Sequence, residues 1–340
     1  MQIHQNISLK PYNTFGIDVT AKHFVTIESM ADLDELKTLP SLSMDHKQIL
    51  VLGGGSNILL TTDFDGTVLK NNLKGIELVS ENENHFYVRC GAGENWHQFV
   101  LHCLQNNYAG VENLSLIPGN TGASPMQNIG AYGVELKDVF HELEAYHLND
   151  DELVTFNNKA CEFGYRESIF KKKYKGQFII TSVTFKLNKK PFYNTSYGAI
   201  QQELEAMGVK EVSIQAISQA VINIRKSKLP DPAIIGNAGS FFKNPTITNQ
   251  KFADLKKEHP SMVGYPSGKD ETKVAAGWMI EQCGWKGYRK GDAGCHEKQA
   301  LVLVNYGNAH GLDIFHLSTE IMQSVEKRFG IILEREVNII

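Results

Sequence analysis

An uncharged, glycine-rich stretch at residues 115–133 constrains this chain more than any other feature. It reads SLIPGNTGASPMQNIGAYG and holds four glycines, two prolines and two asparagines, with no Lys, Arg, Asp or Glu. Glycine lacks a Cβ and permits positive φ, so the backbone can approach a ligand closely. Successive exposed N–H groups then form concavities that bind anions. The stretch predicts a cradle for a diphosphate, whereas the alternative, a flexible connector, would usually be rich in charge or in Ser/Gly repeats.

A second glycine turn, Gly53–Asn57 (GGGSN), follows a short apolar strand at 48–52. A strand that ends in a glycine turn is a common place for phosphate. The turn is not the dinucleotide fingerprint G-x-G-x-x-G, because Ile58 stands where the third glycine belongs. The GAGENW segment fails the same test at Trp96, and no GxxxxGK[ST] sequence occurs. The sequence therefore predicts a bound nucleotide, but it supports neither the dinucleotide-binding fold that has the G-x-G-x-x-G fingerprint nor a P-loop fold.

Length and composition describe an ordinary globular chain. Its 340 residues suggest two or three domains, and the net charge of −4 indicates no broad surface for nucleic acid or anionic membrane. The N-terminal MQIHQNISLK has no signal-peptide pattern, and no apolar run approaches transmembrane length. Five scattered cysteines without CxxC indicate free thiols in a reducing compartment. We therefore expect a cytoplasmic location.

Hydrophobic periodicity and capping signals outline the secondary structure. Strands are expected near 24–26, 48–52, 86–90, 143–148, 178–187 and 300–305, with a last one ending at Ile340. Helices are expected at 31–36, 95–104, 213–225 and 274–283, with another through 314–325 that ends at Gly330. The KLPDP segment at 228–232 ends a helix and marks a domain boundary. Because the strands occur in clusters, the pattern favours α+β layers over a purely parallel sheet.

Six segments in register resemble the UDP-N-acetylenolpyruvoylglucosamine reductase family, flavoenzymes that complete UDP-N-acetylmuramic acid in bacterial peptidoglycan synthesis. They are GGGSN at 53–57, IPGNTGASPMQNIGAYG at 117–133, YRES at 165–168, KLPDP at 228–232, GNAGSFFKNP at 236–245 and LEREV at 333–337. Each is weak alone, but together they cover essentially the whole chain in order. NTSYG around Tyr197 is similar to the family class that has an additional tyrosine-bearing loop.

The resemblance implies a vanillyl-alcohol-oxidase-type FAD-binding fold of two α+β subdomains, followed by an α+β substrate domain. The expected boundaries are 1–70 together with a C-terminal strand at 331–340, then 71–225, then 226–330. It implies a monomer with noncovalent FAD and with NADPH as hydride donor. The two substrates would share one site in a ping-pong sequence, which ends with reduction of UDP-N-acetylglucosamine enolpyruvate.

Three residues match the family's catalytic groups. Arg166 resembles the arginine that binds the substrate carboxylate, and a guanidinium suits a bidentate grip on a carboxylate. Ser240 matches the general acid that protonates C2, with an assisting group that the sequence does not identify. Glu336 matches the glutamate that donates to the developing enediolate, which requires a raised pKa. Pattern alone leaves Glu334 and Glu336 open, because alternate strand residues share a face; the family match selects Glu336.

The resemblance also implies ligand contacts. Cofactor contacts are expected from Gly53, Gly54, Gly55, Ser56, Asn57, Pro118, Gly119, Gly122, Ala123, Ser124, Gln127, Asn128, Gly130, Ala131 and Tyr132. Substrate contacts are expected from Tyr197, Lys228, Asn244 and Gln299. Cys295 and His296 are adjacent and lack companions at zinc spacing, so no metal site is expected.

Two departures and two alternatives accompany this interpretation. Arg335 stands where the family often has proline, and Glu167 stands where aspartate is common. Another FAD-dependent sugar or alcohol oxidoreductase of the same superfamily would share the glycine turns, but not the pair of Ser240 and Glu336. A non-catalytic nucleotide sensor would leave the polar residues of the C-terminal half without a role.

Overall fold

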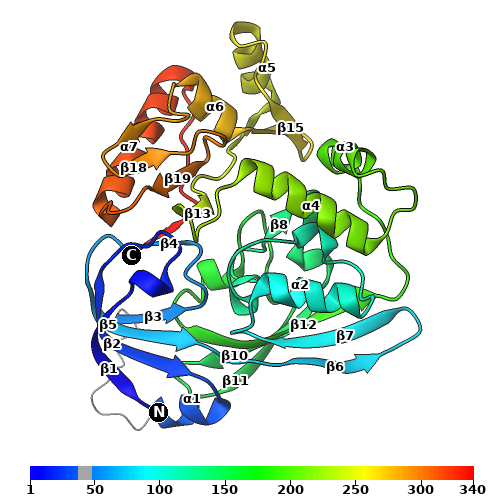
Figure 1. The fold of residues 1–340 in the computed structure, drawn as a ribbon, viewed down its shortest axis with the longest axis vertical. Coiled ribbons are helices and arrows are strands. Elements are labelled where there is room, and N and C mark those ends of the chain that lie inside the picture. Colours follow the sequence, from blue (N-terminus) through cyan, green and yellow to red (C-terminus); the bar gives the residue numbers. More distant parts are fainter. Residues whose placement is uncertain (37–47) are drawn as a thin grey trace. The chain divides into compact units, whose positions relative to one another are not determined.

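The computed structural model describes residues 1–36 and 48–340, and it divides into two compact units (Figure 1). Unit 1 comprises residues 1–7, 21–54 and 64–227, and unit 2 comprises residues 8–20, 55–63 and 228–340. The division at 227/228 lies beside the boundary expected at 225/226. The finer division into 1–70 with 331–340, 71–225 and 226–330 stays a prediction.

Unit 1 begins with a four-stranded sheet in the order β1-β2-β5-β3. The strands are β1 (Ile3–Ser8), β2 (Thr20–Ile27), β3 (Ile49–Leu52) and β5 (Phe64–Asn71), and both β2 and β3 run parallel to β5. Helix α1 (Met30–Leu36) starts at the expected capping box. There Asp32 accepts the Ser29 N–H at 2.8 Å, and Ser29 Oγ accepts the Asp32 N–H at 3.3 Å.

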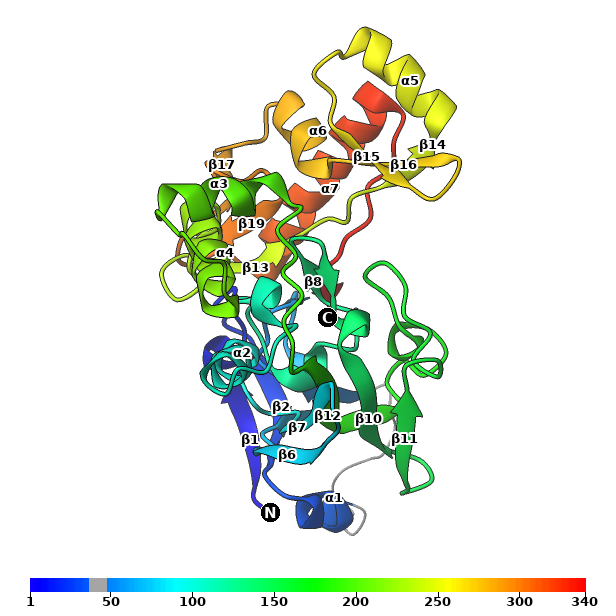
Figure 2. The ribbon, with the colours of Figure 1, turned by 90° about the vertical axis from the view of Figure 1, so that its right-hand side faces the viewer.

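A five-stranded antiparallel sheet in the order β11-β10-β12-β7-β6 forms the larger part of unit 1 (Figures 1 and 2). Its strands are β6 (Ile76–Glu81), β7 (His85–Gly91), β10 (Phe140–His147), β11 (Leu153–Asn157) and β12 (Phe178–Asn188). Helix α2 (Trp96–Gln105) is capped by the Asn95 side chain, which accepts the Gln98 N–H. Its apolar face packs on the sheet, where Phe99 contacts Phe185.

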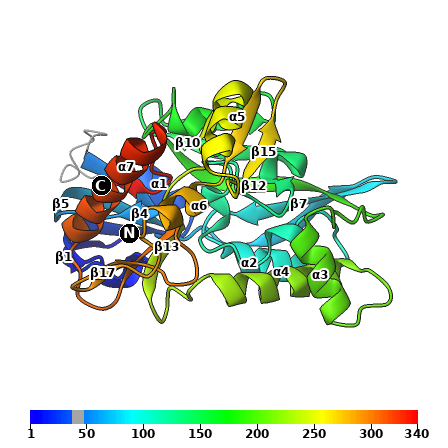
Figure 3. The same cartoon turned by 90° about the horizontal axis from the view of Figure 1, so that it is seen from above.

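Three further elements complete unit 1. The glycine-rich stretch ends in a short hairpin of β8 (Gly130–Ala131) and β9 (Val134–Glu135). Helices α3 (Gly198–Ala206) and α4 (Ile214–Lys228) lie side by side and share a small apolar core (Figure 3). The sequence pattern did not predict α3, which is only nine residues long.

Unit 2 contains an antiparallel sheet in the order β13-β19-β18-β17, with α7 packed against β18 and β19 (Figure 1). These elements are β13 (Gly236–Ser240), β17 (Arg289–Lys290), β18 (Ala293–Cys295), β19 (Val302–Asn305) and α7 (Gly311–Phe329). Helix α6 (Ala276–Gln282) contacts α7. As expected, α7 ends at Gly330, which has a left-handed φ of 61°.

A smaller sheet and a parallel strand pair complete unit 2 (Figure 2). The sheet has the order β14-β16-β15, with strands β14 (Thr246–Thr248), β15 (Gly264–Ser267) and β16 (Glu271–Val274), and it contacts α5 (Asn249–Glu258). The parallel pair joins β20 (Asn338–Ile339) to β4 (Ile58–Leu59). The expected α+β class is confirmed.

Two expected elements differ from the structure. The helix expected at 274–283 starts two residues later, because Val274 belongs to β16 and the Asn244 side chain accepts the Ala276 N–H at 2.9 Å. The expected last strand is interrupted. Arg335 forms an isolated bridge with Phe242, and regular pairing resumes only in β20.

Candidate active site

The two glycine turns that were expected to act together do meet within unit 1. A Cβ added to Gly54 would lie 2.9 Å from Gly119 Cα and 2.9 Å from Asn120 Oδ1. Real Cβ atoms essentially never come that close to another heavy atom, so a side chain at position 54 would push the turns apart. Glycine is therefore required here by close backbone approach.

Backbone hydrogen bonds fix the 115–133 stretch onto the segment before α2. The Thr121 N–H donates to Glu94 O at 2.8 Å, and the Gly122 N–H donates to Ala92 O at 2.9 Å. A Cβ on Gly122 would lie 2.5 Å from Ala92 Cβ. The stretch is therefore an ordered, tightly packed loop, in contrast to a flexible connector.

A lysine that the sequence analysis did not select supports the first turn. Lys70, on β5, donates from Nζ to Gly53 O at 2.8 Å. Burial, assisted by the charge of Lys74, lowers the pKa of Lys70. The ammonium group polarises the peptide at Gly53 and adds positive potential beneath the turn. No pattern distinguishes Lys70 in the sequence, because lysine at the end of a strand is ordinary.

The later part of the stretch uses its polar side chains mostly within the protein. Asn128 is fully buried, and its Nδ2 donates to Glu135 Oε2 and to Gly164 O, each at 3.0 Å. Ser124 Oγ donates to Thr121 O at 2.6 Å. Many backbone amides of the stretch, such as those of Thr121, Gly122 and Ser124, also donate within the protein. Neither glycine turn contains a carboxylate, which suits an anionic ligand such as a diphosphate.

Arg166 lies in a tight turn of unit 1 and has a left-handed φ of 55°. Its Nη2 donates to Gly130 O at 2.9 Å, which ties the arginine to the glycine-rich stretch. The turn is closed by an isolated bridge between Gly164 and Glu167. An ion pair at 2.5 Å joins Glu167 to Lys172, so this departure from the family pattern is accommodated at the surface.

A second guanidinium, that of Arg225 on α4, lies close enough to interact with Arg166 electrostatically. Arg225 donates from Nε to Leu116 O at 3.2 Å and also hydrogen-bonds the Tyr132 hydroxyl. Burial lowers the pKa of Arg225, and the neighbouring positive charge of Arg166 lowers it further. Two arginines on one side of unit 1 create positive potential that suits an anionic ligand.

The sequence analysis missed Arg225, although a signal was present. Arg225 follows Ile214, Ser218 and Val221 at helical spacing on the buried face of α4. An arginine on such a face requires hydrogen-bonded partners, which makes it a candidate functional residue.

The expected substrate residues Tyr197 and Lys228 lie at helix ends. Tyr197 is the N-cap residue of α3, and its ring packs edge-on against Tyr132 with centroids 5.3 Å apart. Lys228 is the last residue of α4 and is exposed.

In unit 2, Ser240 ends β13 just after a bulge. The pairing of β13 with β19 shifts register between Asn237 and Ser240, and Gly239 there has a φ of 69°. The Asn237 side chain is buried and holds the bulge, because its Oδ1 accepts the Gly239 N–H at 3.0 Å. A bulge redirects the side chains around it. The Ser240 side chain is therefore set by Gly239 and Asn237.

Glu336 lies beside this strand. The Glu336 N–H donates to Phe241 O at 2.8 Å, and the Lys243 N–H donates to Glu334 O at 2.9 Å. The structure thus brings the segments that contain Ser240 and Glu336 together. Asn57, expected to contact the cofactor, donates from Nδ2 to Glu336 O at 3.3 Å.

The two glutamates that the sequence pattern could not separate differ in their surroundings. The Glu334 side chain is 72% exposed and forms a 2.9 Å ion pair with Lys243, whereas Glu336 is partly buried. Arg335, between the two glutamates, forms only an isolated bridge with Phe242, so the expected common face of Glu334 and Glu336 stays a prediction. The exposed ion pair leaves Glu336 as the better candidate for chemistry.

Asn244 and Gln299 also lie in unit 2. The Asn244 carboxamide oxygen is engaged at the start of α6, so the carboxamide nitrogen is the group it can offer to a ligand. Gln299 Oε1 accepts the Leu301 N–H at 3.3 Å within a local turn.

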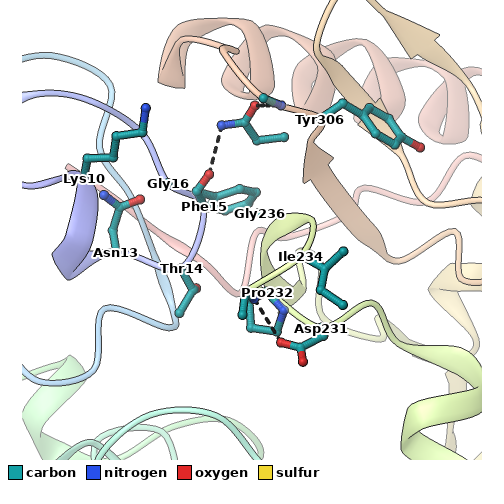
Figure 4. Close-up of a pocket in the computed structure, with 13 residues that line it drawn as sticks. Lys10, Asn13, Thr14, Phe15, Gly16, Asp231, Pro232, Ile234, Gly236 and Tyr306 are labelled. Atoms are coloured by element: carbon teal, nitrogen blue, oxygen red, sulfur yellow. Dashed lines mark hydrogen bonds between the residues drawn. The ribbon is translucent and has the colours of Figure 1, made fainter.

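A separate cavity of about 570 Å³ also lies in unit 2 (Figure 4). Residues 10 and 13–16 line it together with 231–234, 236 and 305–307. Asn305 Nδ2 donates to Phe15 O at 2.9 Å across its edge. None of the expected site residues lines this cavity.

Within 1–36 and 48–340, no three His, Cys, Asp or Glu side chains are grouped so that they could hold a metal ion. In the same part of the chain, no helix has the length and apolar character needed to cross a membrane.

Comparisons with known proteins agree with this geometry. Residues 21–157 match the FAD binding domain family, and residues 231–340 match the C-terminal domain family of UDP-N-acetylenolpyruvoylglucosamine reductase. These two matches confirm the expected order of an FAD-binding part followed by a C-terminal domain of the reductase family.

Full-length relatives carry the same reductase name. UDP-N-acetylenolpyruvoylglucosamine reductases from Flavobacterium johnsoniae and Amoebophilus asiaticus are 51% and 50% identical, and each alignment covers 100% of both chains. The crystal structure of UDP-N-acetylenolpyruvylglucosamine reductase from Thermus caldophilus superposes with a TM-score of 0.67. It is 24% identical, with 100% of this chain and 99% of that chain covered.

Proposed function

Because the chain belongs to the UDP-N-acetylenolpyruvoylglucosamine reductase family, we propose that it reduces UDP-N-acetylglucosamine enolpyruvate to UDP-N-acetylmuramate, with FAD as cofactor and NADPH as hydride donor. The observation that supports the proposal is the pairing of residues 241–243 with 334–336, which brings the segments that contain Ser240 and Glu336 together. The chemistry needs an acid and a stabilising carboxyl group within one site.

The reaction makes defined demands on the protein. When bound, FAD would supply the hydride, taken from NADPH, that adds to the terminal vinyl carbon of the substrate. Negative charge then develops at C2 and spreads into the substrate carboxylate. Hydrogen-bond donors and cations must be in place where this charge appears, because preorganised groups lose no reorganisation energy during the reaction.

We assign one role to each candidate catalytic residue. Arg166 binds the substrate carboxylate through its planar fork, and the charge of Arg225 reinforces it. Glu336, in its protonated form, donates to the enediolate. Ser240 delivers the proton to C2, and the bulge at Gly239 directs its hydroxyl. Arg166 belongs to unit 1, whereas Ser240 and Glu336 belong to unit 2.

The remaining assignments follow the same scheme. The diphosphate of FAD binds to the two glycine turns, at 53–57 and 115–133. The fifteen residues in these turns that the sequence analysis gave as expected cofactor contacts touch the cofactor. Tyr197 and Lys228 bind the diphosphate of the substrate, and Asn244 and Gln299 bind its sugar or uridine. We further propose a cytoplasmic monomer with no nucleic-acid partner, organised in the three domains expected from the sequence.

Half-reaction kinetics test the proposal. Purified protein is reduced with NADPH under anaerobic conditions and then mixed with UDP-N-acetylglucosamine enolpyruvate, while flavin absorbance is followed. We expect rapid reoxidation of the flavin. We expect the Ser240→Ala variant to keep its reduction by NADPH and to slow reoxidation by ~10²-fold or more, because general acids contribute about that much.

Three outcomes would contradict the proposal. Purified protein without bound flavin would indicate a nucleotide sensor. Reoxidation by oxygen alone, with no response to the enolpyruvate, would indicate another flavin oxidoreductase. Equal slowing of both half-reactions by Ser240→Ala would make Ser240 a folding or binding residue.

A further inference from the structure

Arg335 departs from the family pattern, and its contacts give it a specific task. Its side chain extends to α7, where Nε donates to Ser318 Oγ at 2.8 Å and Nη2 donates to Thr319 Oγ1 at 2.6 Å. The guanidinium also lies 4.5 Å from the centroid of the Phe315 ring. All of these residues belong to unit 2.

The two hydroxyl groups are oriented to accept from Arg335. Ser318 Oγ donates to Phe315 O at 2.6 Å, and Thr319 Oγ1 donates to the same carbonyl oxygen at 3.0 Å. A hydroxyl has one proton, so with that proton engaged each oxygen presents only lone pairs to the guanidinium. The planar guanidinium of Arg335 therefore donates to two oriented acceptors on the same turn of α7.

The guanidinium is held without a counter-charge. Among the residues that the structure describes, no carboxylate forms an ion pair with Arg335. Burial lowers the pKa of Arg335, and no neighbouring acid offsets this effect. Arg335 is partly exposed, and its two hydrogen bonds to α7 are a better reason for its position than charge neutralisation.

The anchored residue directly precedes Glu336. The main chain at Glu336 is fixed on one side by Phe241 O and on the other by the Asn57 side chain. Asn338 Nδ2 donates to Asn57 O at 2.9 Å, which secures the chain two residues further on. The attachment of Arg335 to α7 supplies a third fixed point, which is independent of the sheet and of the Asn57 turn.

We infer that Arg335 is a positioning residue for Glu336: by gripping Ser318 and Thr319 of α7, it fixes the backbone from which the Glu336 side chain projects. The inference rests on the proposed function. It concerns only the half-reaction in which Glu336 acts, the transfer from reduced flavin to the enolpyruvate. Reduction of the flavin by NADPH does not use Glu336 and should not depend on Arg335.

The test uses the holoenzyme and measures both half-reactions by stopped flow. For Arg335→Gln we expect flavin reoxidation by the enolpyruvate to slow by ~10- to 100-fold, because a misplacement of about 1 Å can cost 10²-fold. Reduction by NADPH should stay within about twofold of the parent protein. Arg335→Lys keeps the charge but lacks the fork, so it should recover little of the loss.

Two further variants control the experiment. Glu334→Gln removes the exposed ion pair with Lys243 on the same segment, and both half-reactions should stay within about twofold. Ser318→Ala combined with Thr319→Val removes the acceptors and leaves Arg335 in place. It should reproduce the Arg335→Gln effect, and adding Arg335→Gln to it should cause little further loss, since residues that act as one unit are not additive.

Distinct results would overturn the inference. If Arg335→Gln is reoxidised as fast as the parent protein, Arg335 does not position Glu336. If Arg335→Gln does not fold, the same result in the double variant of Ser318 and Thr319 leads to the same conclusion. Parallel slowing of both half-reactions would indicate a merely structural contact. Full rescue by Arg335→Lys would assign the effect to charge. If instead the parent protein is not reoxidised by the enolpyruvate, the proposed function itself fails.

Discussion

At the scale of single residues, His97 couples protonation to the glycine-rich stretch. Its Nδ1 accepts the Leu116 N–H at 3.0 Å, so the ring is neutral there and its proton is on Nε2. Burial lowers the pKa of His97, and the charges of Arg225 and Lys226 lower it further. Protonation would remove the acceptor for Leu116 at the start of the cofactor loop.

The sign of the effect follows from linkage. A histidine with a lowered pKa in the folded state contributes stability that is present above its unfolded pKa and is lost as pH falls through the folded pKa. We expect the unfolding temperature to drop, and FAD to dissociate more readily, between pH 7.5 and pH 5.5. His97→Asn keeps an acceptor near the Nδ1 position but does not titrate. It should reduce this difference in unfolding temperature by about 2–4 °C, which corresponds to ~1 kcal/mol.

Thermal unfolding followed by flavin fluorescence at both pH values measures the difference. His97→Ala, which lacks the acceptor, is the matched comparison and should lower the unfolding temperature at both pH values. An equal pH dependence in His97→Asn and the parent protein would show that other groups cause the acid sensitivity.

The sequence motifs point to candidate reacting residues but not to the residues that support them. Ser240 and Glu336 stand in recognisable motifs, and the structure places their segments together. Lys70 and Asn237 do their work through carbonyl and amide groups of a turn, and such partners depend on tertiary structure that no local pattern encodes. Arg225 lies between these cases, because its position on an apolar helix face was visible in the sequence.

At the scale of elements, the bulge in β13 sets the backbone geometry next to Ser240, the proposed general acid. Gly239 has a φ of 69°, and a Cβ added there would meet no heavy atom within 4 Å. Any effect of a side chain would therefore come from backbone strain and not from collision. An L-residue other than glycine pays roughly 1–2 kcal/mol in this conformation, and asparagine tolerates it best.

We expect Gly239→Ala to lower the free energy of unfolding by about 1–2 kcal/mol. It should also slow flavin reoxidation by the enolpyruvate about tenfold or more, because Ser240 is the next residue. Gly239→Asn should lose less in both measurements. Denaturant unfolding and stopped-flow kinetics check the pair. Identical behaviour of the two variants would mean that the left-handed conformation is not what sets Ser240.

Elements with strong local signals were predicted well, and those defined by long-range contacts were not. The capping box of α1, the Asn95 cap of α2 and the Gly330 end of α7 are all written in a few adjacent residues. The start of α6 depends on Asn244, which is 32 residues away, and the sequence pattern placed it two residues early. Strands of two residues such as β4 and β20 exist only because they pair with each other.

At the scale of the whole molecule, the chain passes repeatedly between its two units. Residues 8–20 and 55–63 belong to the unit that also contains the C-terminal third of the chain. The hydrogen bond from the Asn57 side chain to the Glu336 carbonyl oxygen joins residues that are 279 positions apart in the sequence. Loop-closure entropy and strand register decide such contacts, and neither can be read from periodicity. The family resemblance supplied what periodicity could not.

The reactivity of the five cysteines can be used to follow the opening of each unit separately. Cys90, Cys103 and Cys161 are buried in the main core of unit 1, whereas Cys295 is buried in unit 2 and Cys283 is partly exposed there. Burial raises the pKa values of Cys90, Cys161 and Cys295 to about 12, so their thiolates are scarce in the native state. The buried thiols can react only when the unit around them opens.

We therefore expect a thiol reagent such as DTNB to modify about one cysteine, Cys283, in native protein at pH 8, and all five in denaturant. In mild denaturant the three thiols of unit 1 should react with one common rate and Cys295 with another, because each core opens as its own cooperative body. Most of the proposed FAD contacts lie in unit 1, so added FAD should slow the first group more strongly than Cys295. Peptide mapping by mass spectrometry assigns the rates. A single rate for all four buried thiols, slowed uniformly by FAD, would mean that the two units open together.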